Sequence, residues 1–198
     1  MERALIFVLA ALVVAPSATM AAKPDYNYLE AGYNDVDVDA LDEGDGFFGG
    51  GSIGFARNWH ILGRYDDNEI DNGSELTSWM AGVGWHGLFS ERGDLVGELF
   101  WVDIKRKNAG GVTTKEDGLG ARAGIRLRLF KSLEVGAFGK WQDLDSAGTS
   151  SKRTSTSSSG FEANAIYHFS RIGIGLGWED INDIETFNAF ARLNFGKQ

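Results

Sequence analysis

Residues 119–129 alternate strictly between two kinds of side chain. One set is apolar and the other is glycine and arginine: Leu119, Ala121, Ala123, Ile125, Leu127 and Leu129 against Gly120, Arg122, Gly124, Arg126 and Arg128. Successive side chains of an extended strand point to opposite faces, whereas a helix would mix the two sets on every face. The segment is therefore predicted to be a β-strand with one apolar face and one polar face.

The segment at residues 186–195 repeats this pattern. Its apolar face consists of Phe187, Ala189, Ala191, Leu193 and Phe195, and Asn188, Arg192 and Asn194 lie on the other face with Phe190 as an apolar exception. Such a strand suits lipid on one side and a polar interior on the other. We interpret it as the strand that closes a barrel, with Arg192 predicted to pair with an interior carboxylate, Glu30 first.

Ten segments of this kind run through the chain. They cover residues 26–36, 47–56, 59–67, 76–87, 95–103, 119–129, 133–142, 161–169, 172–179 and 186–195. Short turns alternate with longer connections, among them polar loops at residues 105–116 and 143–159. Bacterial membrane barrels have even strand numbers and the same alternation of connections. The sequence predicts an all-β, closed, antiparallel up-and-down transmembrane barrel of ten strands, or of eight if two segments do not span.

The aromatic residues separate into two levels. The upper ring is predicted to be Phe47, Tyr65, Trp79, Trp101, Trp141 and Trp178, and the lower ring Phe55, Trp59, Trp85, Phe130, Phe169 and Phe195. Aromatic girdles at both interfaces are typical of membrane barrels. A soluble, lipocalin-like barrel is the alternative, but it would turn these tryptophans inward and Arg122, Arg126 and Arg128 outward.

The first residues differ from the rest of the chain. A short charged start, an apolar run and small residues predict a signal peptide at residues 1–21, which is removed, and an outer-membrane barrel at residues 22–198. The chain has no cysteine and a net charge of −9. An acidic balance argues against nucleic acid as a partner.

Charged residues of both signs lie on the predicted interior faces. The lumen cluster consists of Glu30, Arg64, Glu98, Arg122, Arg126, Arg128, Glu134, Lys140, Glu162 and Arg192. Unpaired buried charge is costly, so these residues are expected to pair and fill the lumen. The alternative is a narrow porin-like channel in which Arg122, Arg126 and Arg128 select small anionic solutes.

Three weaker patterns concern catalysis and metals. His168 and Ser170 have the spacing of a His-x-Ser pair, with Glu162 or Glu179 as orienting carboxylates, so a lipid A-modifying enzyme is a distant alternative. His60 and His86 would face each other inside the barrel without an evident third ligand. We expect no catalytic residues, no metal site and no cofactor beyond weak Mg²⁺ or Ca²⁺ association with acidic loops.

Two short motifs resemble a known group of proteins. The sequences Tyr-Asn-Tyr at residues 26–28 with Ala-Gly-Tyr at 31–33, and residues 58–65, resemble the small Gram-negative outer-membrane barrels of the OmpA-like and porin-like superfamily. The resemblance is to a short-barrel subgroup once proposed as secreted signalling or immune-eliciting factors. Members often end on an aromatic residue as an assembly signal, whereas here residues 196–198 follow Phe195.

The resemblance implies an integral outer-membrane protein with a structural or surface-interaction role and mobile extracellular loops. Its expected partners are outer-membrane lipid and lipopolysaccharide, and the barrel assembly machinery during biogenesis. We expect the protein to be monomeric.

Overall fold

The computed structural model describes residues 23–38, 43–146, 154–181 and 184–196. The predicted signal peptide therefore lies outside the described residues. Within those ranges, no helix is long and apolar enough to cross a membrane.

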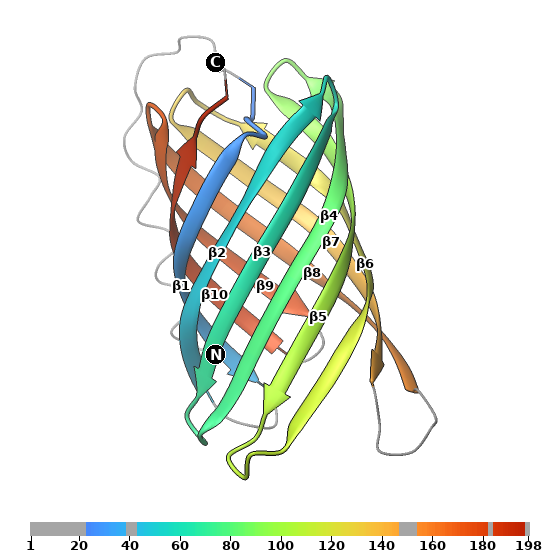
Figure 1. The fold of residues 1–198 in the computed structure, drawn as a ribbon. Helices are drawn as coiled ribbons and strands as arrows, with labels where there is room; N and C mark the ends of the chain where they lie inside the picture. The colour runs from blue at the N-terminus through green and yellow to red at the C-terminus, as the bar shows by residue number, and fades with distance from the viewer. Residues whose placement is uncertain (1–22, 39–42, 147–153, 182–183, 197–198) are drawn as a thin grey trace.

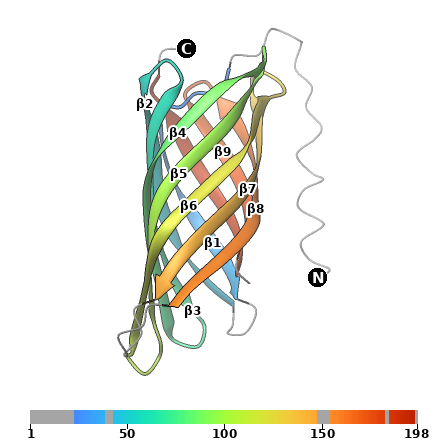
Figure 2. The same cartoon turned by 90° about the vertical axis from the view of Figure 1, so that its right-hand side faces the viewer.

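Ten strands form one closed antiparallel barrel, so the ten-strand prediction is confirmed and the eight-strand alternative is wrong (Figures 1 and 2). The strands are β1 (Tyr28–Val38), β2 (Glu43–Ala56), β3 (Trp59–Ile70), β4 (Ser74–Ser90), β5 (Gly93–Lys107), β6 (Thr113–Arg128), β7 (Leu133–Ser146), β8 (Thr154–Phe169), β9 (Ile172–Ile181) and β10 (Ile184–Asn194). Each strand pairs with its neighbours in the chain, and β1 pairs with β10.

The two ends of the barrel differ. At the short-turn end, tight connections join β2 to β3, β4 to β5, β6 to β7 and β8 to β9, and the described chain ends there as well (top of Figure 1). At the long-hairpin end, the β5–β6 hairpin extends furthest of the connections that the structure describes (bottom of Figure 1). We use these two names below.

The closing pair keeps the predicted register. Leu29 is opposite Leu193, Glu30 opposite Arg192 and Ala31 opposite Ala191. Because side chains alternate along each strand, this register sends Glu30 and Arg192 to the same interior face. A slip of one residue would reverse the faces of the whole strand.

The alternation predicted from the sequence separates the outer surface from the interior. Apolar alternates such as Leu119 (59 % exposed) and Ile174 (58 %) cover the outer face, whereas Glu134 (1 %) and Arg128 (4 %) are buried inside. The residues named as aromatic girdles all lie on the outer face. Eleven of the twelve are well exposed, and Trp178 is half-buried and donates a hydrogen bond from Nε1 to Glu185 Oε1 at 2.7 Å.

The predicted polar loops are largely strands. The loop expected at residues 105–116 is shortened because β5 extends to Lys107 and β6 begins at Thr113. The loop expected at 143–159 is likewise replaced by the ends of β7 and β8, and only residues 147–153 lie outside the described residues. Pairing satisfies the backbone of these polar residues without apolar burial, and Trp141 Nε1 adds a cross-strand hydrogen bond to Ser157 Oγ at 2.7 Å.

The first strand also begins later in the chain than the sequence predicts. It begins at Tyr28 rather than Tyr26, because residues 23–27 leave the ladder and turn into the short-turn end. Tyr26 and Tyr28 are both buried, at 6 % and 9 % exposed.

The register of closure can be tested by crosslinking, since the chain has no native cysteine. We expect an Ala31→Cys/Ala191→Cys variant to form an intramolecular disulfide on oxidation, because the two residues are direct partners across the closing strands. Non-reducing gel mobility of the folded and unfolded forms measures the bond. An Ala31→Cys/Ala163→Cys variant, which joins β1 to the non-adjacent β8, is the control. Equal crosslinking in both variants would contradict this closure.

Candidate functional site

The candidate site is the barrel interior, which changes in character from one end to the other. Near the long-hairpin end, the side chains of Arg64 and Glu179 are 24 % and 25 % exposed. The Arg122 side chain is 14 % exposed, and those of Glu98 and Glu134 only 5 % and 2 %. The interior is therefore open to water from the long-hairpin end and closed towards the short turns.

Glu134 is the centre of the closed part. Its carboxylate accepts hydrogen bonds from Arg126 at 2.5 and 3.1 Å, and Arg128 and Arg192 approach it to 3.6 and 3.7 Å. His168 Nε2 lies 3.3 Å from its other oxygen. We call these five residues the Glu134 cluster. Because three guanidinium groups surround it, the buried carboxylate of Glu134 is not left as an unpaired negative charge.

Arg192 links this cluster to the closing strand. It donates two hydrogen bonds to Glu30 Oε2, at 2.9 Å from Nε and 2.6 Å from Nη2, so the predicted Glu30–Arg192 pair is present. Its guanidinium carbon also lies 4.0 Å from the ring centre of Tyr28. The seam between β1 and β10 is thus joined by an ion pair as well as by the backbone ladder.

Tyr26 fills the other side of the closed part. Its ring stacks on His86, with centroids 3.7 Å apart and planes 5° apart, and packs with Val96 and Phe138. Its hydroxyl donates to Asp94 Oδ2 at 3.2 Å, and the Arg126 guanidinium lies 4.6 Å from the ring centre. One side chain therefore contacts residues from β4, β5, β6 and β7.

Backbone contacts hold the segment that carries Tyr26. Arg126 donates to the Asp25 carbonyl at 3.3 Å, and Phe195 N–H donates to the Asn27 carbonyl at 2.9 Å. The side-chain oxygen of Asn27 accepts from Gly54 N–H at 3.0 Å. Residues 23–27 thus form a short plug, which we call the N-terminal plug, across the short-turn end.

A chain of polar contacts leads from Tyr26 towards the barrel centre. His60 Nδ1 lies 3.3 Å from His86 Nδ1, and His60 Nε2 lies 3.0 Å from Glu98 Oε1. Arg122 donates to the other oxygen of Glu98 and, at 2.6 Å, to Glu162. The predicted approach of the two histidines is confirmed. Among the described residues, however, no group of three His, Cys, Asp or Glu is arranged to hold a metal ion.

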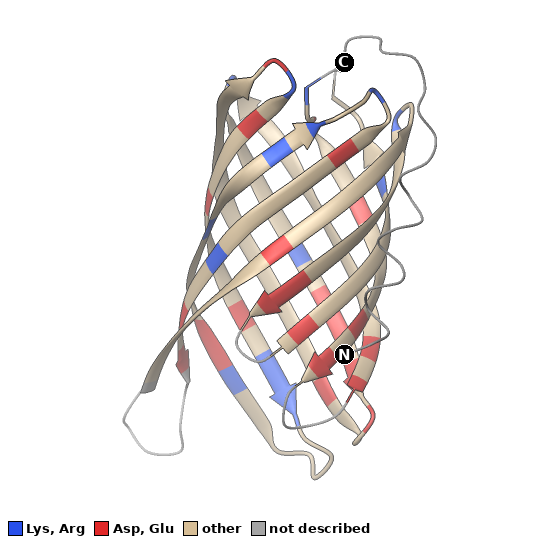
Figure 3. Cartoon of the chain, turned by 180° about the vertical axis from the view of Figure 1, so that it is seen from behind, with Lys and Arg blue, Asp and Glu red and all other residues tan. Residues whose placement is uncertain are grey.

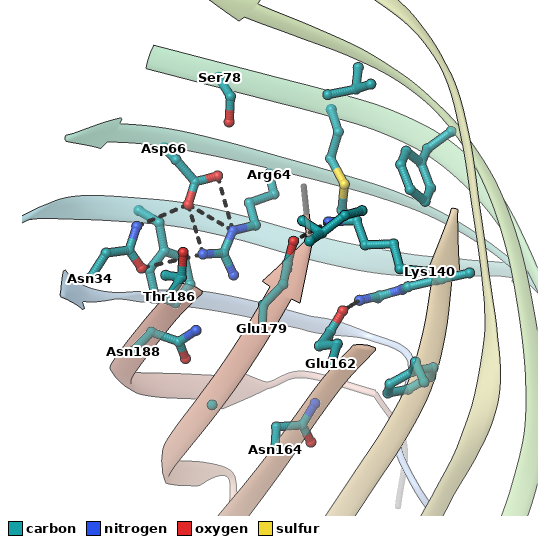
Figure 4. A pocket seen from close by; sticks show the side chains of 18 of the residues that line it. Asn34, Arg64, Asp66, Ser78, Lys140, Glu162, Asn164, Glu179, Thr186 and Asn188 are labelled. Atoms are coloured by element: carbon teal, nitrogen blue, oxygen red, sulfur yellow. Dashed lines mark hydrogen bonds and ion pairs between the residues drawn. The ribbon is translucent and has the colours of Figure 1, made fainter. Parts of the chain in front are cut away.

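The open part of the interior is a cavity of 190 Å³ (Figure 4). Arg64 donates to Asp66 at 2.7 Å on one side of it, and Lys140 donates to Glu179 at 2.6 Å on the other. These four residues are thus paired, whereas Arg106, which also lines the cavity, has an Nε without a hydrogen-bond partner among the described residues.

The structure brings the predicted lumen charges together in pairs. All ten point inward, and the three arginines of the proposed anion ladder each lie beside a carboxylate: Arg122 beside Glu98 and Glu162, and Arg126 and Arg128 beside Glu134. Carboxylates at these distances reduce the positive charge that an anion-selective filter would need. In Figure 3, acidic positions gather towards the long-hairpin end, whereas basic positions are more frequent near the short turns.

The predicted His-x-Ser pair is not assembled. His168 is buried in the Glu134 cluster, with Nδ1 3.2 Å from Asn194 Nδ2. Ser170 is exposed in the β8–β9 turn, where its positive φ of 63° serves the change of direction. Glu162 and Glu179 pair with Arg122 and Lys140 rather than with His168.

The acidic groups expected in loops lie mainly on strands. Outward-facing Asp35, Asp45, Glu69 and Glu75 are successive cross-strand partners on β1 to β4. Asp66 instead faces inward and pairs with Arg64.

Sequence alternation placed Phe48 and Phe190 on the interior face, but it missed Tyr26 and Tyr28 as aromatic residues of the lumen. Tyr26, Tyr28, Phe48 and Phe190 have the parity of the polar face, and they pack inside against arginines and one another. The sequence contains a signal for these residues, because an aromatic side chain at a position of the polar face must point into the barrel. Only Phe190 stood out as an exception within a well-defined strand.

Comparisons with known proteins concern the fold. The β domain of the Bordetella autotransporter BrkA matches at a TM-score of 0.50 and 10 % identity, covering 87 % of this chain and 100 % of that one. Neisserial surface protein A (TM-score 0.43, 10 % identity, covering 85 % and 95 %) and Ail of Yersinia pestis (0.38, 11 %, covering 86 % and 98 %) also match. No protein-family model and no curated protein matches the chain. The chain has the closed antiparallel fold of small outer-membrane β-barrel proteins.

The burial of the Glu134 cluster predicts how the loss of its carboxylate affects the free energy of unfolding. We expect Glu134→Gln to lower the free energy of unfolding by about 3 kcal/mol or more, because removing one partner of a buried ion pair leaves uncompensated charge. The half-exposed pair of Glu75 and Lys107, at 2.7 Å, provides the control, and Glu75→Gln should cost less than about 1 kcal/mol. Urea titration of each variant in lipid vesicles, followed by tryptophan fluorescence, measures both. Similar losses in the two variants would argue against the cluster as a stabilising centre.

Proposed function

We propose that the protein is an integral outer-membrane barrel with a structural or surface-interaction role, and that its lumen does not conduct. The observation that supports this function is the closed short-turn half of the interior. There, the Glu134 cluster and Tyr26 fill the lumen from opposite sides, and their side chains are almost inaccessible to water. A polar interior with an apolar exterior is the arrangement of membrane barrels.

The outer surface supports placement in a membrane. Its exposed side chains are apolar through the middle of the barrel, with aromatic residues towards both ends. In this proposal the short-turn end is periplasmic and the long hairpins are extracellular, where they meet lipopolysaccharide. The barrel acts as a monomer after insertion by the barrel assembly machinery, with Phe195 as the aromatic residue directly after the last strand.

Membrane placement can be tested with two substitutions on the same face of β6. Ala123 lies midway along the exposed outer face, and Thr113 lies at the hairpin end of the same strand. We expect Ala123→Arg to lower the free energy of unfolding in bilayers by about 2–4 kcal/mol, because arginine near the bilayer midplane is poorly solvated. Thr113→Arg, the control, should have little effect. Urea titration in lipid vesicles measures both, and equal effects would argue against this placement.

The alternative function is a narrow channel. Electrical recording distinguishes such a channel from a sealed barrel. We expect the purified protein in planar lipid bilayers to show no current above leak, because the short-turn half is filled. Tyr26→Ala should introduce conductance, since it removes a side chain that contacts residues of β4, β5, β6 and β7 there. Tyr26→Phe retains the ring and should remain silent. Discrete conductance of the unmodified protein would overturn the sealed-barrel proposal in favour of a pore.

A further inference from the structure

One arginine of the barrel interior has no counter-ion. Arg106 lies one residue from the end of β5, where it is half-buried and lines the cavity. It makes no hydrogen bond, ion pair or cation–π contact with any residue that the structure describes, and its Nε is buried. The other interior cations of the described strands each lie beside a carboxylate: Arg64, Arg122, Arg126, Arg128, Lys140 and Arg192. A buried donor without a partner is uncommon and calls for an explanation.

Arg106 is one of three hydrogen-bond donors around Leu76. Leu76 of β4 is directly opposite Asn68 of β3 on one side and directly opposite Arg106 of β5 on the other. Ser78 is the next residue of β4 on the same inward face, and all four residues line the cavity. Because directly opposed residues have Cα atoms about 5 Å apart, the three polar side chains border one patch of the cavity wall. We call Asn68, Ser78 and Arg106 the Arg106 cradle.

All three side chains of the cradle have unused donors. Asn34 donates to Asn68 Oδ1 at 3.1 Å, so the Asn68 amide has its Nδ2 group left to offer, and that group makes no hydrogen bond to a described residue. The Ser78 hydroxyl likewise makes none, and no dashed contact reaches it in Figure 4. The Nη groups of Arg106 are accessible, because only Nε among its nitrogens is buried. The cradle thus combines a positive charge with neutral donors on two neighbouring strands, which is the arrangement that an anion needs.

The two interior carboxylates nearest the cradle in register do not pair with Arg106. Asp66, opposite Ser78, accepts hydrogen bonds from Arg64 at 2.7–3.0 Å. Glu116 faces inward on β6, two residues along from the partner of Arg106, but forms no ion pair with a described residue. The cradle therefore carries one uncompensated positive charge, and Glu116 opposes a second negative charge on any ligand.

The apolar neighbours of the cradle indicate the kind of anion. Leu76 lies between the three donors, and Ile104 is the neighbouring inward residue of β5. Hydrocarbon packs favourably against such side chains, whereas a strongly hydrated inorganic ion gains nothing from them. A guanidinium group can also bind both oxygens of a carboxylate through two parallel hydrogen bonds. An organic ion with a single carboxylate thus matches the charge, the donors and the apolar surface.

We propose that the Arg106 cradle binds the carboxylate of a small, monovalent organic acid, whose apolar part rests on Leu76 and Ile104. The acid enters from the long-hairpin end into the cavity of 190 Å³. This site differs from the predicted anion ladder of Arg122, Arg126 and Arg128, because those arginines are paired and Arg106 was not among the predicted lumen charges. The inference goes beyond the sealed barrel and does not depend on it, since the cradle lies in the open half of the interior.

Titration with four ligands of the same chain length tests the site. The barrel is refolded in an uncharged maltoside detergent, and butyrate, butyramide, butylammonium and succinate are added in turn while amide and side-chain NMR shifts are followed. We expect saturable shifts with butyrate around the cradle and at least tenfold weaker binding of neutral butyramide. Butylammonium should not bind there, and the dianion succinate should bind no more tightly than butyrate.

Three variants relate binding to the proposed residues. Arg106→Gln should weaken butyrate binding by at least about tenfold, because it removes a charge-assisted hydrogen bond. Lys105→Gln is the matched control, since it removes the same charge from the next residue of β5, which is exposed on the outer face, and it should bind normally. Glu116→Gln should tighten binding, because it removes a negative charge near the cradle.

Heat-modifiable gel mobility confirms that each variant is folded before it is titrated. Absence of saturable butyrate binding, or equal binding by the Arg106→Gln variant, would overturn the proposal. Equal binding of butyramide would remove the role of charge, and an equal loss in the Lys105→Gln variant would reduce the effect to surface charge; either result would also overturn it. So would tighter binding of succinate or weaker binding by the Glu116→Gln variant. Conductance is not read in this experiment, so its result stands apart from that of the sealed-barrel test.

Discussion

The pairing of β1 with β10 is the constraint on which the rest of the structure depends. In an apolar medium every backbone donor and acceptor must be satisfied within the protein, and a sheet achieves this only by closing on itself. The register that joins Ala31 to Ala191 closes the ladder around ten strands. Once the sheet is closed, every second side chain is confined to a narrow interior, whatever its charge.

This confinement explains the chemistry of the lumen. Buried charges are tolerated only when they are paired and hydrogen-bonded. Glu134, at 1 % exposed, is surrounded by three arginines from β6 and β10, and Arg122 is shared between Glu98 and Glu162. Glycines on the neighbouring strands give these long side chains room.

Prediction from sequence succeeded where polar and apolar faces contrast, and failed where that contrast disappears. The strand of Leu119 and Arg122 was assigned without ambiguity, and the Glu30–Arg192 pair followed from alternation and the order of the strands. Where the hairpins extend past the aromatic girdle, both faces of their strands are exposed to water. A polar strand such as the start of β8 then has the composition of a loop, although its ladder is complete. The extent of the hairpins therefore could not be predicted.

The sequence by itself determined the two faces of each strand and the signs of the interior charges, because these follow from a local period of two, and it limited the strand number to ten or eight. Apart from the Glu30–Arg192 pair and the approach of His60 to His86, it did not determine which interior residues meet. The Glu134 cluster and the stack of Tyr26 on His86 each join strands far apart in the chain. Their contacts depend on the stagger of ten strands and on the course of the N-terminal plug. Only the tertiary structure decides the stagger and the path of the plug. The offset between neighbouring strands adds up around the barrel, and the sequence of a single strand does not encode it.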